Sequence, residues 1–369
     1  MVEFDAYGPE KIIEVYNPKV GMRGYAILDN LALGPAKGGI RMTPTVSMDE
    51  IAKLARTMTW KNALAGLPFG GGKSGIIANP KEFSLEKKKE IIEAFSKALK
   101  IVCPDFYVAA PDINTAEQEM EWFAKANGNK KACTGKPKKM GGIPHELGST
   151  GFGVAHATSI ALKHMKKNIK GVTFAVEGFG NVGTFSAKFL TEAGAKLVAV
   201  SDSKGCIYVK KGIDYDKLMK VKGEAGSVTN YPGTAGSCHN IINSRADILV
   251  TAAIPDLIKP RDVNRIKVKL IIQGSNIPMA EQVEILLHKK GVLVVPDFVA
   301  NAGGVISSYV EYIGGSEKKM FKLVEKKIKK NTNLVLNLAR KNKTHPRAAA
   351  IEIAQKRVLS KCEVCAVKL

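Results

Sequence analysis

The sequence contains no long hydrophobic run. No stretch of about eighteen consecutive apolar residues occurs among its 369 residues, so it predicts no membrane-spanning helix. The first residues, MVEFDAYGPEKIIEVY, carry acids early and have no apolar core of the kind that a secretory signal needs. We therefore expect a cytoplasmic protein.

Cysteine is also sparse, with six residues scattered along the chain. Such scatter is typical of reduced thiols in an intracellular protein. Cys362 and Cys365 form one CxxC pair, but a structural zinc site needs two further ligands nearby, and none accompanies this pair. The sequence therefore disfavours zinc or redox chemistry, and we predict no metal.

Acidic residues are outnumbered, with 34 Asp and Glu against 56 Lys and Arg, and the net charge is +22. Such an excess can mark a nucleic-acid-binding protein. In segments such as KEFSLEKKKEIIEAFSKALK, however, the basic residues alternate with acids above apolar positions at helical spacing, which is typical of solvated helix faces. We therefore expect no nucleic-acid partner, although nucleic-acid binding stays as a distant alternative. A positive field would also attract an anionic substrate or a phosphorylated cofactor.

The chain has no low-complexity segment and no repeat, and its length favours two domains. Residues 1–147 mix strand-like and helical patterns. The Gly-, Pro- and Lys-rich passage from Cys133 to Gly153 has the composition of an interdomain connection. In residues 148–344, short apolar runs such as GVTFAVEGF alternate with helical ones, which predicts an α/β fold with a parallel, doubly wound sheet of the Rossmann type. We expect a last helix, in residues 345–369, to pack back on the first domain.

The segment VEGFGNVG has the spacing of a dinucleotide-binding fingerprint, after a predicted strand and at the start of a predicted helix. Gly178 would allow the tight turn, Gly180 the approach of a pyrophosphate, and Gly183 the close packing of helix on strand. Asn181 and Val182 open the helix, whose N-terminus supplies unpaired N–H groups. The segment therefore predicts a binding site for NAD or NADP.

Two residues at the end of the next predicted strand bear on the choice of coenzyme. Asp202 follows Gly183 by nineteen residues and could accept hydrogen bonds from the adenosine ribose. Lys204 lies close by and could bind a 2′-phosphate. The carboxylate favours NAD and the lysine favours NADP, so the sequence leaves the preference open.

The segment GLPFGGGKSG crowds glycines around Lys73. A P-loop needs a glycine, four spacers and then Gly-Lys-Ser/Thr, but the residue at the first glycine position is Leu67. We therefore reject a P-loop nucleotidase. Lys37 in GPAKGGIRM and Lys61 in MTWKNALAG stand in comparable contexts, and AAPDINT supplies Asp112. Beside a dinucleotide fold these lysines indicate a pocket for an anionic substrate, in which a buried lysine of lowered pKa could serve as an acid or base.

From about Tyr25 to the C-terminal helix the chain resembles the glutamate/leucine/phenylalanine/valine dehydrogenases. The resemblance is carried by GPAKGGIRM, LPFGGGKSGI, APDINT, STGFG, GFGNVG and PDFVANAGGVISSYVEY. It implies that Lys73 is catalytic, that Lys61 holds the α-carboxylate of the substrate, and that Asp112 moves protons during imine formation and hydrolysis. It also implies roles beside the coenzyme or at its junction with the substrate for Thr150, Asn181, Asn276 and Asn301.

The resemblance further implies a substrate. Glutamate-specific members have a lysine and a serine where Lys37 and Ser308 stand, and these bind the side-chain carboxylate. The leucine and phenylalanine enzymes have apolar residues at both places, because a buried ammonium without a carboxylate is costly. We therefore expect L-glutamate, 2-oxoglutarate and ammonium as substrates, with a leucine, valine or phenylalanine dehydrogenase as the alternative. The chain departs from the family at Glu146, where many members have arginine, and at Asn114, where glycine or tyrosine is common.

Family membership also implies how the domains are used. Residues 1–147 would bind the substrate and form the oligomer, commonly a homohexamer, and residues 148–344 would bind NAD or NADP. Closure between the domains would exclude water from the reacting atoms.

Overall fold

The computed structural model describes residues 2–366, which divide into two compact units. The first unit is made of the residues up to Leu147, Val305–Met320 and the residues from Glu352 on, and the second of Gly148–Gly304 and Phe321–Ile351. The first unit thus includes a segment, residues 305–320, that the sequence analysis assigned to the second domain.

Aromatic packing explains why this segment belongs to the first unit. The ring of Phe69 lies edge-on against those of Tyr309 and Tyr312, with centroids 5.9 and 5.2 Å apart. At the end of the chain, the guanidinium of Arg357 donates hydrogen bonds to the carbonyls of Ala63 and Leu64. The final return to the first unit therefore begins at Glu352 and not at residue 345.

A five-stranded sheet of order β1-β2-β4-β3-β5 forms the centre of the first unit. Its strands are β1 (Lys11–Asn17), β2 (Met22–Asn30), β3 (Ala36–Thr43), β4 (Gly70–Ile77) and β5 (Tyr107–Pro111). Strands β1, β2 and β4 pair antiparallel, whereas β4, β3 and β5 run parallel. β4 is the middle strand and is hydrogen-bonded along both edges, so the GGGKSG segment is a strand and not a phosphate-binding loop.

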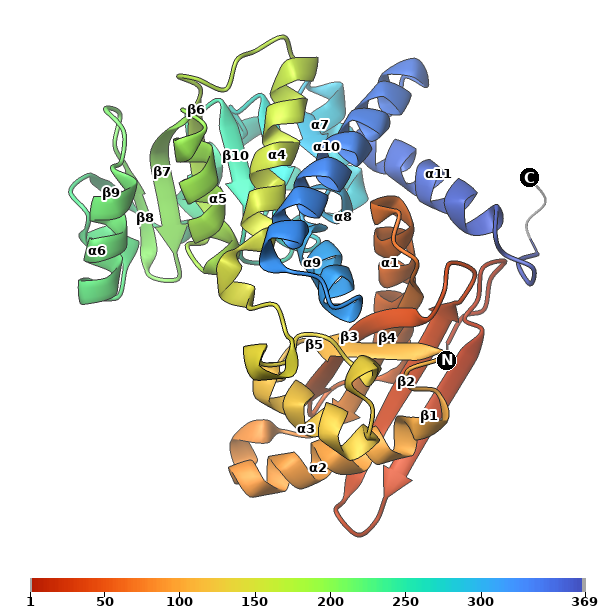
Figure 1. Ribbon diagram of the computed structural model, residues 1–369. Coiled ribbons are helices and arrows are strands. Elements are labelled where there is room, and N and C mark those ends of the chain that lie inside the picture. Colours follow the sequence, from red (N-terminus) through yellow and green to blue (C-terminus); the bar gives the residue numbers. More distant parts are fainter. Residues whose placement is uncertain (1, 367–369) are drawn as a thin grey trace. The chain divides into compact units, whose positions relative to one another are not determined.

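Helices cover both faces of this sheet (Figure 1). α2 (Leu85–Ala98) and α3 (Glu117–Asn127) bury Phe95 and Phe123 against one face, while α1 (Met48–Ala65) packs Ile51 on the other. The glycines of β4 make this second contact unusually close, since a Cβ atom at Gly71 would lie 1.9 Å from Thr59 Oγ1. Only a glycine strand can therefore lie this near to α1.

The second unit is built on a seven-stranded sheet of order β12-β11-β10-β6-β7-β8-β9. The first five strands in this order are parallel, and β8 and β9 extend the edge antiparallel. The strands are β6 (Thr173–Glu177), β7 (Lys196–Asp202), β8 (Gly205–Tyr208), β9 (Thr234–Gly236), β10 (Ile248–Thr251), β11 (Leu270–Gln273) and β12 (Leu293–Val295). This arrangement confirms the predicted Rossmann-type sheet.

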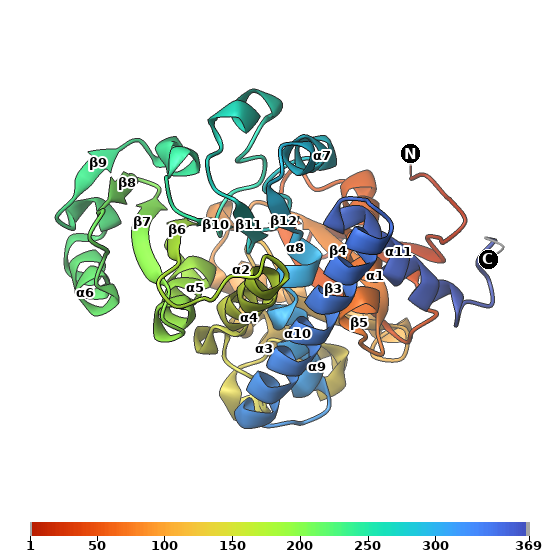
Figure 2. The same cartoon turned by 90° about the horizontal axis from the view of Figure 1, so that it is seen from above.

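Helices lie on both faces of this sheet, as Figure 2 shows for α5 and α7. α4 (Ser149–His164) and α5 (Asn181–Glu192) pack together on one face, and α7 (Glu281–Lys289) buries Leu287 against the other. The remaining helices are α6 (Tyr215–Ala225), α8 (Asp297–Ala300), α9 (Gly303–Tyr312), α10 (Glu317–Lys341) and α11 (Pro346–Leu359).

The structure bears on membrane-spanning helices and on the cysteines. Within residues 2–366 no helix is long and apolar enough to cross a membrane. Cys362 and Cys365 are joined by a disulfide, whereas the sequence analysis expected reduced thiols throughout, and the expectation is wrong for this pair. The other four cysteines are free thiols.

Candidate active site

The parallel strands β3, β4 and β5 bring Lys73 and Asp112 into direct contact. Lys73 Nζ lies 2.9 Å from Asp112 Oδ2, and the same oxygen accepts a hydrogen bond of 2.9 Å from Arg41 Nε. Burial lowers the pKa of the Lys73 ammonium, although the Asp112 carboxylate partly offsets this. Burial acts to raise the pKa of Asp112, but Lys73 and Arg41 together hold it below its usual value. The pair therefore combines an ionised carboxylate with an amine that releases its proton readily.

Glycine in the neighbouring strand makes this contact possible. Gly39 of β3 faces the pair, and a Cβ atom there would lie 2.8 Å from Asp112 Cβ and 3.3 Å from Lys73 Nζ. Any side chain at this position would push the two groups apart. The glycines of GPAKGGIRM thus leave room for Lys73 and Asp112 to meet.

Arg41 and Asn114 hold Asp112 and the turn after it. The Arg41 guanidinium bridges the carboxylates of Asp112 and Glu50, the latter in α1. The sequence did not reveal this partner of Asp112. Asn114 has a φ of 61° and donates a hydrogen bond from Nδ2 to the Met42 carbonyl. Asn tolerates left-handed backbone better than most residues with a side chain, so Asn114 suits this turn.

Lys37 lies on β3, next to the strand that carries Lys73. Its side chain is buried, with 3% of the residue exposed, and Nζ donates a 3.0 Å hydrogen bond to the Ala109 carbonyl. Burial lowers the pKa of Lys37 to about 7, an effect that the charge of Glu311 only partly offsets. No carboxylate among residues 2–366 lies within ion-pair distance of this ammonium. The structure therefore holds a buried cation without an ion-pair partner.

Lys61 and Ser308 belong to the same unit as Lys37. Lys61 is half-buried on α1, a helix held to β4 by the hydrogen bond from Asn62 Nδ2 to the Gly70 carbonyl, 2.7 Å long. Ser308 is half-buried on α9. Both residues thus belong to elements of the first unit.

Sequence reasoning missed a buried ion pair in this unit. Lys136 Nζ lies 2.6 Å from Glu311 Oε1, and 6% and 2% of these side chains are exposed. Glu311 follows Ser308 by three positions, which places both on one face of α9. That spacing was the available signal, but a glutamate in an apolar helical run does not by itself reveal its partner.

The fingerprint residues lie at the carboxyl edge of the second unit's sheet. Gly178 adopts a φ of +83°, and a Cβ atom at Gly183 would lie 1.8 Å from the Gly178 carbonyl oxygen. In contrast, a Cβ atom at Gly180 would meet nothing within 4 Å. Open space therefore lies over Gly180 at the N-terminus of α5, where an approaching pyrophosphate could accept hydrogen bonds.

Asp202 is fully engaged by protein groups. Its carboxylate accepts hydrogen bonds from the backbone N–H groups of Lys204 and Val228, from Ser227 Oγ and from Lys222 Nζ, at 2.9–3.1 Å. Burial acts to raise its pKa, but these donors lower the pKa of Asp202 to about 2. Since an ionised carboxylate has about four acceptor sites, Asp202 has none left for a ribose. The cation beside it is Lys222, which the sequence analysis did not single out.

A pair of asparagines lies at the same edge of the sheet. Asn301 Nδ2 donates a 2.9 Å hydrogen bond to Asn276 Oδ1, while Asn301 Oδ1 is buried without a hydrogen-bond partner. Asp297, itself held by Arg347, fixes the turn by accepting from the Ile277 N–H. An unpartnered buried acceptor is costly, and a donor such as a carboxamide would satisfy it.

The second unit therefore fits a nicotinamide dinucleotide. The open glycine turn can receive its pyrophosphate, and Asn301 Oδ1 can accept from its carboxamide. Thr150, on α4, borders the same region, since a Cβ atom at Gly304 would lie 3.2 Å from Thr150 Oγ1. The residues that the sequence predicted for the coenzyme thus lie at one edge of the sheet. Asp202 lies there too, but its carboxylate accepts hydrogen bonds from protein groups.

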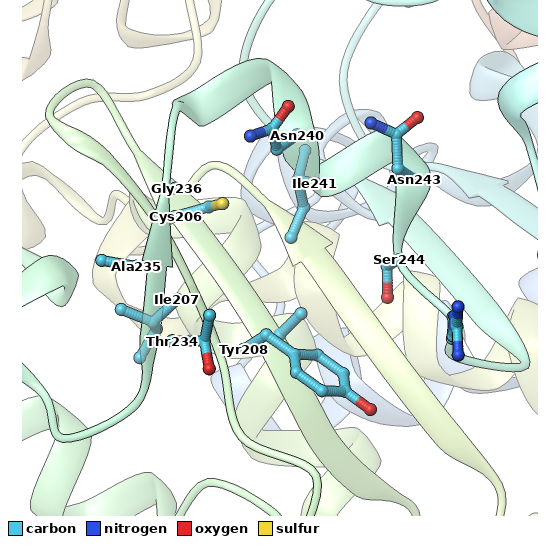
Figure 3. A pocket seen from close by; sticks show the side chains of 12 residues that line it. Cys206, Ile207, Tyr208, Thr234, Ala235, Gly236, Asn240, Ile241, Asn243 and Ser244 are labelled. Atoms are coloured by element: carbon cyan, nitrogen blue, oxygen red, sulfur yellow. The ribbon is translucent and has the colours of Figure 1, made fainter.

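A separate pocket of about 280 Å³ lies elsewhere in the second unit. Figure 3 shows Cys206, Tyr208 and Ile241 among the side chains that line it. None of the predicted coenzyme residues contributes to its wall. Tyr208 pairs with Ala199, three residues before the carboxyl end of β7, so the pocket is set back from the dinucleotide edge.

Comparisons with known proteins show the family to which the chain belongs. The model of the Glutamate/Leucine/Phenylalanine/Valine dehydrogenase family matches residues 141–364, and the model of the family's dimerisation domain matches residues 9–128. The chain is 43% identical to a glutamate dehydrogenase of Aeropyrum pernix, over 91% of this chain and 84% of that protein. It is 39% identical to an NADP-specific glutamate dehydrogenase of Saccharolobus shibatae, over 82% of this chain and 75% of the relative.

A solved structure is similar over nearly the whole length. The hetero-hexameric glutamate dehydrogenase of Thermus thermophilus, in its leucine-bound form, superimposes with a TM-score of 0.86 at 26% identity, covering 98% of this chain and 91% of that chain. The two family matches together span most of the sequence. The chain therefore belongs to the Glutamate/Leucine/Phenylalanine/Valine dehydrogenase family and is an amino-acid dehydrogenase, an oxidoreductase that uses NAD or NADP.

Proposed function

We propose that this dehydrogenase interconverts L-glutamate with 2-oxoglutarate and ammonia. The observation that carries the proposal is the buried Lys37 ammonium, which has no carboxylate partner within the described residues. A side-chain carboxylate of the substrate would supply that partner, whereas an apolar side chain would leave the charge buried and unpaired. The glutamate dehydrogenases among the relatives support the same substrate.

In this proposal lysines bind both ends of the substrate. Lys37, with Ser308, binds the side-chain carboxylate, and Lys61 binds the α-carboxylate. Two fixed charges define the position of a dicarboxylate and thereby the position of its α-carbon. In the second unit, Asn301 accepts from the coenzyme carboxamide through its Oδ1, which has no partner among residues 2–366.

Lys73 and Asp112 carry out the proton transfers. The nicotinamide, when bound, would accept the hydride from the α-carbon, and the substrate nitrogen, having lost its ammonium proton, would become the protonated imine of 2-iminoglutarate. Lys73, whose pKa is lowered by burial, removes a proton from a water molecule that adds to the imine. Asp112, 2.9 Å from Lys73 Nζ, passes protons to the leaving ammonia, and Arg41 holds its carboxylate in place.

We also propose that the coenzyme is NADP. The oxygens of Asp202 already accept hydrogen bonds from protein groups, so they have no acceptor site left for the two ribose hydroxyls of NAD. Lys204 and Lys222 place positive charge beside it, which suits a 2′-phosphate. The NADP-specific relative supports this choice.

The test of both proposals is reductive amination at saturating ammonium, followed by the loss of nicotinamide absorbance. The substrates are 2-oxoglutarate and 4-methyl-2-oxopentanoate, each with NADPH and with NADH. We expect strong preference for 2-oxoglutarate and for NADPH. Preference for the branched oxoacid would reject glutamate as the substrate, and equal rates with both coenzymes would reject the role of Asp202 and its lysines.

We further propose a homo-oligomer, with a hexamer as the finer assignment. The match to a dimerisation domain supports assembly, and the hexameric Thermus thermophilus enzyme supports the number. Closed symmetry is the general expectation for such enzymes. The cytoplasmic location expected from the sequence stays a prediction.

The lowered pKa of Lys37 predicts a pH dependence of dicarboxylate binding. Only the protonated amine attracts a carboxylate, and burial lowers its pKa to about 7 in the free protein. We therefore expect the affinity for glutarate, an unreactive dicarboxylate, to fall as the pH rises through about 7, by up to about tenfold per pH unit. Above this pH, glutarate binding should take up a proton, which calorimetry in buffers of different ionisation enthalpy measures.

Butyrate, which has only one carboxylate, is the matched ligand for this experiment. Its binding should lack the step near pH 7 if it occupies the α-carboxylate site. A glutarate affinity that is constant from about pH 6 to about pH 9 would contradict the assignment of Lys37, because a group of pKa near 7 must titrate in this range.

A further inference from the structure

Glu311 is held by four donors from one segment of the first unit. Its carboxylate accepts hydrogen bonds from the N–H groups of Gly135, Lys136 and Ile143, at 2.9, 3.3 and 3.3 Å, and from Lys136 Nζ at 2.6 Å. Lys136 Nζ also donates to the Cys133 carbonyl at 2.6 Å. The carboxylate is therefore both neutralised and fixed in position within a buried site.

The same carboxylate acts on Lys37 through the neighbouring segment. The Ala109 carbonyl that accepts from Lys37 Nζ also accepts a 2.9 Å hydrogen bond from the Thr134 N–H, and the next residue, Gly135, donates to Glu311. The charge of Glu311 attracts the Lys37 ammonium, whereas Lys136 and Lys73 repel it. Yet Glu311 forms its ion pair with Lys136, and the hydrogen bond of Lys37 Nζ within residues 2–366 goes to the Ala109 carbonyl. Two buried lysines thus compete for one buried carboxylate, and Lys136 holds it.

We propose that Lys136 is a specificity-determining positioning residue, which binds Glu311 and so keeps the Lys37 ammonium available for a carboxylate of the substrate. This inference rests on the proposed function, since it concerns how Lys37 selects a dicarboxylate. Without Lys136, the charge of Glu311 would act on the buried Lys37 without being neutralised by its own ion pair. If Glu311 neutralised Lys37, a substrate carboxylate would add less binding free energy at this site. An apolar substrate side chain would in turn cost less binding free energy there.

Electrostatics favours this reading over a purely structural one. A buried ion pair is weak evidence for stability, because the desolvation of both charges offsets their attraction. Three backbone N–H groups would hold the Glu311 oxygens without any lysine. The main effect of the Lys136 charge is therefore to compensate the charge of Glu311 beside Lys37. In the low dielectric of the interior, an uncompensated charge interacts strongly with its neighbours.

The experiment compares Lys136→Met with the double variant Lys136→Met/Glu311→Gln. In the single variant the KM for 2-oxoglutarate should rise about tenfold, which corresponds to one pKa unit of added interaction between Glu311 and Lys37, while kcat changes little. The preference for 2-oxoglutarate over 2-oxopentanoate, measured as the ratio of kcat/KM values, should fall by a similar factor. Glutarate binding, followed by calorimetry, should weaken in parallel.

The double variant separates the electrostatic role from a structural one. Glutamine keeps acceptors for the backbone N–H groups but carries no charge, so Lys37 is again without an internal partner. We expect the double variant to regain most of the wild-type KM and preference for the dicarboxylate. A double variant as impaired as the single one, or a single variant that behaves like the wild type, would overturn the proposal.

Lys138→Met is the matched control. Lys138 lies two residues further along, pairs with Glu317 at 3.0 Å and is exposed, so its loss should leave KM and preference unchanged. If Lys136→Met does not fold, the double variant still decides: loss of dicarboxylate preference there overturns the proposal. A wild-type enzyme that does not prefer 2-oxoglutarate would instead reject the proposed function.

Discussion

Replacement of Lys73 by methionine should lower kcat for the reductive amination of 2-oxoglutarate by about 10²- to 10⁴-fold, the usual contribution of a general acid–base group. Methionine fills nearly the same volume but cannot take up or release a proton. The loss should fall on kcat, because the proposed function assigns the binding of the two carboxylates to Lys37 and Lys61. Steady-state rates at saturating ammonium, with KM determined separately, measure this division.

The control for this change is Lys53→Met. Lys53 is exposed on α1 and pairs with Asp49 at 2.8 Å, so its removal should leave kcat and KM unchanged. Circular dichroism of both variants checks that they fold. A Lys73→Met enzyme that keeps more than a tenth of the wild-type kcat would show that another group moves the protons.

The second large effect is expected for Lys37→Leu. Removal of one partner of a buried charge pair costs about 2–5 kcal/mol, so kcat/KM for 2-oxoglutarate should fall by between about 30-fold and several thousand-fold. With 4-methyl-2-oxopentanoate the variant should gain relative activity, because leucine replaces a charge that rejects apolar side chains. The ratio of kcat/KM for the two oxoacids is the measurement.

Lys19→Leu controls for the loss of a positive charge anywhere on this unit. Lys19 is exposed in the turn between β1 and β2, so its replacement should leave the ratio of kcat/KM for the two oxoacids unchanged. Equal losses with both oxoacids in Lys37→Leu would contradict a role in specificity. Such a result would indicate damage to the shared site instead.

Much of the fold could be predicted, because it depends on local pattern. The alternation of short apolar runs with helical ones predicted the parallel sheet of the second unit, and the spacing of Gly178, Gly180 and Gly183 predicted the turn between β6 and α5. Both signals come from residues close together in the sequence. The structure adds that a Cβ atom at Gly183 would collide with the Gly178 carbonyl.

The charge balance of the site could not be predicted in the same way. The partners of Asp202 and Glu311 come from segments 20 and 175 residues away, and no local pattern links them. The sequence showed that Asp202 and Lys204 were near each other but not that Lys222, Ser227 and Val228 would also donate to the carboxylate. Tertiary contacts decide whether a carboxylate already accepts hydrogen bonds from protein groups or can accept them from a ligand. The proposed preferences for coenzyme and substrate both depend on this.

The position of Lys73 on β4 also bears on motion. β4 is the central strand of its sheet and is hydrogen-bonded to β2 on one side and β3 on the other. Amide hydrogens in such a strand exchange with solvent through large openings of the sheet, because no small fluctuation exposes them. The backbone that carries the Lys73 amine is therefore among the last parts of the unit to open. Small fluctuations of the native sheet therefore leave the contact between Lys73 and Asp112 in place.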